Sequence, residues 1–233
     1  MGEVIEFPGR GHVDRGYLAT PASGSGRPVL VIQEYWGLVP HITSVCDRFA
    51  AEGFTALAPD LYHGRSTFEP GEAEKEMMNL DIEGAGRDLE SAVAHLLDSP
   101  SATGRTVGVV GFCLGGGLAL YIASRQPEIA ACVVYYGVGP ARERLDLSGM
   151  RASVLGHWGE HDDSYDHATI EDLETRLREA GAVVESFWYD AGHAFFNDDR
   201  PSAHDEASAR LSWERTLAFL RSHLADREQL AGV

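Results

Sequence analysis

A cysteine between glycines carries the pattern of a catalytic nucleophile. Residues 107–112 are short, apolar and rich in valine, which predicts a strand buried on both faces of a parallel sheet. The apolar run 118–123 predicts a buried helix. Between them, Gly111-Phe-Cys-Leu-Gly115 has the form of a nucleophile elbow with Cys113 as the nucleophile. Such a strand-to-helix turn needs neighbours without side chains, because flanking Cβ atoms would collide with the adjacent strand and helix.

Two other interpretations of this turn remain open. Glycine-rich strand-to-helix turns also bind phosphate, and a free cysteine is often only a small buried apolar residue. The segment lacks the Lys-Ser/Thr pair of a P-loop and the G-x-G-x-x-G spacing of a dinucleotide site. We therefore favour the elbow. The helix that follows would direct its N-terminal N–H groups at Cys113 and at a developing oxyanion.

Acidic and histidine partners for Cys113 follow later predicted strands. Asp162 comes after the strand 152–158, and His193 comes after the last strand, 183–189. Nucleophile, acid and histidine in this order are typical of α/β-hydrolases. A thiol is mostly protonated at neutral pH, and His193 could act as the base that it needs. Asp162 would orient the imidazole and stabilise the imidazolium, with the adjacent Asp163 as the alternative.

His157 and His161, two of the ten histidines, are four residues apart, a spacing that could suggest a metal site. They fall on a predicted strand and its loop rather than on one helical face, so we expect no metal ligands. The three cysteines are an odd number without a C-x-x-C pair, which argues against disulfides and a structural zinc site. We expect free thiols, with Cys46 and Cys132 packed in the core.

Strands alternate with helices, which predicts an α/β fold with a mostly parallel central sheet and helices on both faces. Residues 1–22 predict an N-terminal antiparallel hairpin at one edge. The other expected strands are 29–33, 54–58, 107–112, 131–136, 152–158 and 183–189, and the expected helices are 41–53, 72–79, 86–97, 118–123, 170–180 and 205–224. The polar connection 63–83 is long enough to form one wall over a site.

The carboxyl ends of parallel strands meet at one edge of the sheet, where sites of such folds lie. Residues directly after the predicted strands are therefore the candidates for chemistry. They are Glu34, Tyr35, Asp60, Cys113, Tyr136, Asp162 and His193.

Length and composition limit the partners. At 233 residues the chain suits a single domain spanning 1–233. The net charge of −17 disfavours nucleic acid and anionic membranes. No leader sequence or membrane-spanning run is apparent, so we expect a cytoplasmic protein. A small-molecule substrate is the expected partner, and both a monomer and a small homo-oligomer are compatible with the sequence.

The sequence resembles the dienelactone hydrolase (carboxymethylenebutenolidase) family of the α/β-hydrolase superfamily. The matching segments, in order, are Gln33-Glu-Tyr-Trp-Gly, Ala58-Pro-Asp-Leu-Tyr, Gly111-Phe-Cys-Leu-Gly-Gly-Gly, Tyr135-Tyr-Gly-Val-Gly, Gly159-Glu-His-Asp and Ala191-Gly-His-Ala-Phe. The resemblance implies an α/β-hydrolase fold and a hydrolase, free of cofactor and metal, that opens a lactone or small carboxylic ester. It also implies a Cys-His-Asp triad of Cys113, His193 and Asp162.

Further roles come from the same resemblance. Glu34 matches a carboxylate that meets the resting thiol and helps form the thiolate when substrate arrives. A fixed negative charge would disfavour a thiolate, so this carboxylate makes sense only as a switchable proton acceptor. An ordinary loop salt bridge is the alternative for Glu34. The oxyanion donors would be the backbone N–H groups of Leu114 and Tyr35.

The substrate pocket departs from the family pattern. Asn197 stands where the family has an Arg that binds the substrate carboxylate, and the segment 66–80, matching a second family Arg, holds four Glu and only Lys75 as a cation. Without a bidentate guanidinium, an anionic lactone would lose its main orienting contact. A neutral or cationic ester is therefore one alternative, and a non-catalytic small-molecule binding protein of the same fold is another. The residues expected to contact substrate are Trp36, Tyr136, Phe195 and Asn197.

Overall fold

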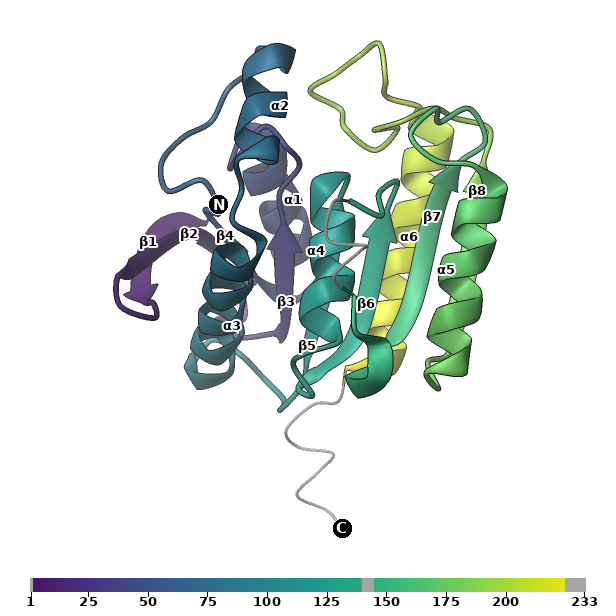
Figure 1. Ribbon diagram of the computed structural model, residues 1–233. Helices are drawn as coiled ribbons and strands as arrows, with labels where there is room; N and C mark the ends of the chain where they lie inside the picture. The colour runs from purple at the N-terminus through teal and green to yellow at the C-terminus, as the bar shows by residue number, and fades with distance from the viewer. Residues whose placement is uncertain (1, 140–144, 225–233) are drawn as a thin grey trace.

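An eight-stranded sheet runs through the computed structural model, which describes residues 2–139 and 145–224 (Figure 1). The strand order is β1-β2-β4-β3-β5-β6-β7-β8. The β1–β2 and β2–β4 pairs are antiparallel, and all other pairs are parallel. The strands are β1 (Glu3–Pro8), β2 (Val13–Ala19), β3 (Arg27–Ile32), β4 (Phe54–Pro59), β5 (Val107–Phe112), β6 (Ile129–Tyr135), β7 (Ser153–Gly159) and β8 (Val184–Tyr189). The predicted fold class, including the N-terminal hairpin at the edge, is confirmed.

Helices cover both faces of this sheet (Figure 1). One face packs against α1 (Pro40–Ala51) and α6 (Glu206–His223). The other packs against α3 (Ile82–Asp98), α4 (Leu114–Ala123) and α5 (His167–Glu179). The short α2 (Pro70–Met78) lies near the carboxyl ends of the parallel strands, and a 3-10 turn spans Leu147–Gly149. No helix in the described ranges is long and apolar enough to cross a membrane.

Two helices, α3 and α5, begin earlier than their apolar periodicity predicts, and an aspartate caps each one. Asp81 accepts a hydrogen bond from the N–H of Glu83 at the start of α3. Asp166 accepts one from the N–H of Thr169 at the start of α5. A capping carboxylate satisfies an N–H group that the helix leaves without an internal partner. The helix therefore starts at the cap rather than at the first apolar residue.

The core has two layers, one on each face of the sheet. The parallel strands β4 and β5 are buried along their whole length, as expected for strands covered on both faces. Cys46 and Cys132 are fully buried in opposite layers, as predicted, and burial raises the pKa of both thiols. His157 is also buried, where desolvation lowers its pKa to about 3 and hydrogen bonds join its ring to Tyr189 and Thr216. It is a core residue.

Candidate active site

The turn between β5 and α4 holds Cys113 in a conformation that few residues adopt. The backbone of Cys113 has a φ of 52° and a ψ of −115°. A Cβ on Gly111 would overlap the carbonyl oxygen of Gly115, and a Cβ on Gly115 would overlap that of Ile32. A Cβ on Gly137 would likewise overlap the carbonyl oxygen of Cys113. The glycine pattern is therefore required by backbone packing, which holds the end of β5 against the start of α4.

Backbone strain concentrates around this turn. Among the described residues, four that are not glycine have positive φ, and three of them line one cavity: Cys113 at 52°, Tyr136 at 39° and Ala194 at 61°. Such conformations cost of the order of 1–3 kcal/mol each and persist only where the surroundings impose them. Their clustering marks this edge of the sheet as a functional site.

His193 and Asp162 form a short hydrogen bond at this edge. The Nδ1 of His193 donates to the Oδ2 of Asp162 at 2.6 Å, and the Asp162 side chain is fully buried. The other Asp162 oxygen accepts a hydrogen bond of 2.8 Å from the N–H of Ser164. Asp163 is exposed. The structure thus brings Asp162, rather than its neighbour, to the imidazole.

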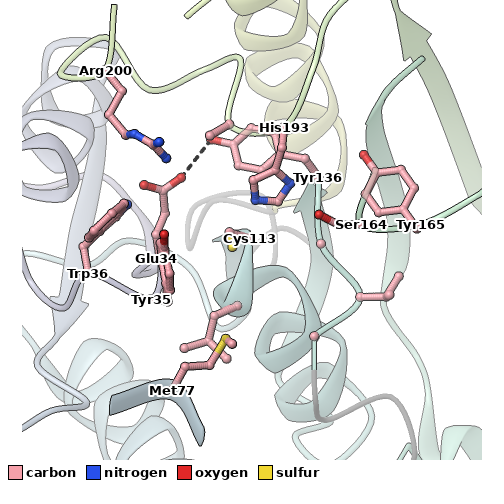
Figure 2. A pocket seen from close by; sticks show the side chains of 15 residues that line it. Glu34, Tyr35, Trp36, Met77, Cys113, Tyr136, Ser164, Tyr165, His193 and Arg200 are labelled. Carbon is pink, nitrogen blue, oxygen red and sulfur yellow. Dashed lines mark hydrogen bonds between the residues drawn. The ribbon is translucent and has the colours of Figure 1, made fainter. Parts of the chain in front are cut away.

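The imidazole of His193 points toward Cys113, and both residues line one cavity (Figure 2). Burial lowers the pKa of His193, but its interactions with Asp162 and Cys113 outweigh burial and raise it to about 10. Burial also raises the pKa of Asp162, and the hydrogen bond from His193 brings it below its ordinary value. The ionised carboxylate of Asp162 therefore favours the imidazolium form of His193.

A cavity of about 530 Å³ opens in front of Cys113 (Figure 2). Leu114 is the first residue of α4, so its N–H lies outside the hydrogen bonds of the helix itself. Gly115 closely approaches the end of β3, and Leu114 and Tyr35 line the same cavity. The side chains and backbone that line the cavity belong to Glu34, Tyr35, Trp36, Met77, Cys113, Leu114, Tyr136, Gly137, Val138, Gly139, Ser164, Tyr165, His193, Ala194 and Arg200.

Glu34 is a buried carboxylate in the cavity wall. Its Oε1 accepts a hydrogen bond of 3.3 Å from the hydroxyl of Tyr136, and its Oε2 accepts one of 2.6 Å from the amide of Asn197. Within the described residues, no hydrogen bond joins Glu34 to Cys113, so these two donors hold the carboxylate in the resting site. The loop salt bridge considered for Glu34 is likewise not among these contacts.

Two of the four residues expected to contact substrate lie behind the cavity. Asn197 is 2% exposed and holds Glu34 from the far side. Phe195 is fully buried against the ring of Tyr136, with 5.2 Å between the ring centroids. Trp36 and Tyr136 do line the cavity.

Arg200 is a cavity residue that sequence reasoning missed. Its guanidinium lies over the ring of Trp36, 5.1 Å from the centroid, at the Glu34 side of the cavity (Figure 2). The family pattern predicts a cation at the Asn197 position and in the segment 66–80. Arg200 lies in the loop beyond both. The only sequence signal is a basic residue soon after His193.

The long connection after β4 contributes less to the cavity than expected. From α2, only Met77 lines it. The acidic residues Glu69, Glu72 and Glu74 are exposed, and Glu76 lines a different cavity. Asp60, at the start of this connection, accepts hydrogen bonds from the backbone of Tyr62 and Gly64 and so shapes the turn. The acidic segment therefore gives the catalytic cavity no negative charge of its own.

Comparisons with known proteins show the family of this chain. The model of the dienelactone hydrolase family matches residues 15–224. A carboxymethylenebutenolidase of Pseudomonas sp. (strain P51) is 35% identical over 230 residues, which cover 94% of each chain. The protein usf of Aquifex pyrophilus is 34% identical over 232 residues, covering 96% of this chain and all of that one. A solved dienelactone hydrolase of Anabaena variabilis, 20% identical, shares the fold with a TM-score of 0.69 over 97% of this chain and 99% of that one.

Proposed function

The chain belongs to the dienelactone hydrolase family and is a hydrolase of ester or lactone bonds, and on that premise we propose that Cys113, His193 and Asp162 are its catalytic triad. The proposed reaction is the opening of a lactone or small carboxylic ester by acyl transfer to the thiol. One observation carries it: the imidazole of His193 stands between a buried carboxylate and a cysteine held on a strained strand-to-helix turn. This arrangement supplies a nucleophile, a base and an orienting acid together.

The first half of the reaction forms an acyl-enzyme. The thiolate of Cys113 attacks the carbonyl carbon of the substrate, and the carbonyl oxygen becomes an oxyanion. The N–H groups of Leu114 and Tyr35 stabilise that oxyanion, aided by the positive end of α4. When the tetrahedral intermediate collapses, the C–O bond to the leaving oxygen breaks. The imidazolium of His193 protonates this oxygen, and a thioester remains on Cys113.

The second half releases the acid. The imidazole of His193, now neutral, takes a proton from water as the hydroxyl oxygen attacks the thioester carbon. A second oxyanion forms in the same place and collapses with cleavage of the C–S bond. Cys113 leaves as thiolate, and the product leaves as a carboxylic acid. Asp162 keeps the imidazole in one tautomer and stabilises its charged form throughout.

Glu34 acts on the resting thiol in this proposal. Its carboxylate is held by Tyr136 and Asn197 at the cavity wall. A substrate that displaces either hydrogen bond frees the carboxylate to accept the thiol proton, which links formation of the thiolate to substrate arrival. A permanently positioned negative charge beside Cys113 would instead disfavour the thiolate.

Arg200 provides a cation for an acidic substrate. The sequence has no Arg at the Asn197 position or in the segment 66–80, and this absence favours a neutral ester. Arg200 supplies a guanidinium to the cavity from a different position in the chain. Arg200 and the apolar ring of Trp36 form one side of the cavity, while Cys113 lies at its base. We therefore favour a small ester or lactone that carries a carboxylate, with a neutral ester as the alternative.

The test is steady-state hydrolysis of a dienelactone and of a neutral aryl acetate by wild type and Cys113→Ala. We expect turnover to fall by about 10⁴-fold or more in the variant, because the covalent route is lost. The intact mass of wild type trapped during turnover should increase by one acyl group. Cys132→Ala, which removes a buried thiol, is the matched control and should keep kcat. Unchanged turnover in Cys113→Ala would refute the triad, and turnover of only the neutral ester would refute the acidic substrate.

A further inference from the structure

Four side chains with metal-binding atoms meet away from the catalytic cavity. His12 lies in the β1–β2 turn, Asp14 on β2, His63 after β4 and Asp88 on α3. One ligand atom from each lies within 4.8 Å of those of the other three. Three separate segments of the chain, the N-terminal hairpin, the connection after β4 and α3, therefore converge on one point with two imidazoles and two carboxylates.

The carboxylates of this cluster are buried and incompletely satisfied. The side chains of Asp14 and Asp88 are 4% and 7% exposed. The Nε2 of His12 lies 2.6 Å from Asp14 Oδ1 and 3.3 Å from Asp88 Oδ1, and His63 Nε2 lies 3.4 Å from Asp88 Oδ2. The remaining oxygen, Asp14 Oδ2, is buried without a hydrogen-bond partner. A buried carboxylate oxygen without a partner is costly and points to a ligand.

The neighbouring cations are already paired with other acids. Arg10 lies 2.8 Å from Glu90, and Arg65 lies 3.2 Å from Glu76. Arg87 lies 3.5 Å from Asp81. All three arginines line a cavity of about 370 Å³ beside the cluster. Among the described residues, the ion-pair partners of Asp14 and Asp88 are the two histidines and no Arg or Lys.

We propose that His12, Asp14, His63 and Asp88 bind a divalent transition-metal ion of the zinc type. Two imidazole nitrogens and two carboxylate oxygens are a donor set that zinc accepts, with bonds of about 2.0–2.2 Å in tetrahedral geometry. The two carboxylates balance the charge of the ion, and both histidines bind as neutral imidazoles. Small inward movements of side chains that already lie within 4.8 Å of one another complete the geometry.

The ion would act on stability rather than on the chemistry at Cys113. Its ligands join the N-terminal hairpin, the start of the connection after β4, and α3. The neighbouring α2 separates the two cavities, since Glu76 lines the one beside the cluster and Met77 lines the catalytic one. A metal at the cluster would therefore hold in place the connection after β4, whose helix α2 contributes Met77 to the catalytic cavity. Metal that binds only the folded chain stabilises it by mass action.

The test is calorimetric titration of the chelator-treated full-length chain with Zn²⁺, together with its melting temperature with and without Zn²⁺. We expect one equivalent to bind at this site and to raise the melting temperature. The double variant His12→Asn/His63→Asn should lose at least about 10-fold in affinity, because even partners of metal ligands contribute 10–100-fold. Its melting-temperature shift should disappear.

Two controls keep this test decisive. His161→Asn removes an exposed histidine paired with Asp190 at 2.6 Å and should leave Zn²⁺ binding intact. Cys113→Ala removes the catalytic thiol as a competing ligand, and one equivalent should still bind. Metal-free double variant should keep its hydrolytic activity and circular dichroism spectrum, which shows that it folds. Equal Zn²⁺ affinity in wild type and the double variant would overturn the proposal, as would no binding by either.

Discussion

The catalytic cavity has two sides that are built differently. On the side of the proposed triad, Cys113, Asp162 and His193 lie within four residues of the ends of β5, β7 and β8. On the loop side, Arg200 and Met77 come from long connections well beyond the ends of β8 and β4. The sheet fixes the triad side through backbone packing and hydrogen bonds, whereas side-chain contacts such as Arg200 on Trp36 fix the loop side. In the proposed function, bond making is therefore tied to the sheet, and substrate preference to the loops.

The largest effect is expected on the triad side. Asp162→Asn should lower kcat by about 10⁴-fold, because an amide favours the wrong tautomer of His193. Asp163→Asn, one residue away and exposed, should change kcat by no more than about twofold, as expected for a surface substitution. Steady-state kinetics on the same ester check both. Equal losses in the two variants would contradict the assignment of the acid to Asp162.

An intermediate effect is expected from Arg200→Gln on the loop side. Loss of a hydrogen bond to a charged group costs about 1.5–3 kcal/mol, or about 10–100-fold in kcat/KM. This loss should appear chiefly in KM and only for an ester that carries a carboxylate. Hydrolysis of a neutral aryl acetate by the same variant is the control and should change little. A comparable loss on both substrates would show that Arg200 supports the fold of the cavity rather than substrate preference.

The smallest effect is expected at Asp198, whose hydrogen bond with His41 anchors the loop that carries Arg200. A hydrogen bond from His41 holds the pKa of Asp198 at about 2, against the opposing effect of burial. A lowered carboxyl pKa adds stability above the ordinary value of about 3.9, and that stability is lost as pH falls toward 2. Asp198→Asn should therefore cost under about 1 kcal/mol at pH 6, since the side chain is half exposed.

Urea unfolding from pH 6 down to pH 2 checks this anchor. The difference between wild type and Asp198→Asn should shrink toward zero as the pH falls. Asp199→Asn, an exposed neighbour, is the matched control and should show no such convergence. A difference that stays constant over this range would mean that the anchor does not act through the charge of Asp198.

The two sides also differ in how far the sequence predicts them. The fold and the meeting of His193 with Asp162 follow from strand ends and chain order, because parallel strands bring their carboxyl ends to one edge. Arg200 and the hydrogen bond from Asn197 to Glu34 were not predicted, because long loops settle through contacts between distant residues. The cluster of His12, Asp14, His63 and Asp88 was not predicted either, for the same reason. The prediction of no metal rests on His157 and His161, which are close together in the chain, whereas His12 and His63 are far apart in it.

The glycines of the elbow have a consequence for how this protein can evolve. Backbone meets backbone at Gly111, Gly115 and Gly137, so no residue with a side chain can enter these three positions without moving a strand or a helix. The side chain of Cys113 itself projects into open cavity. Replacing Cys113 by Ser, which exchanges sulfur for oxygen, would leave the backbone packing at these glycines intact. Changes of the nucleophile or of the loops are therefore compatible with this backbone packing, whereas changes of the three glycines are not.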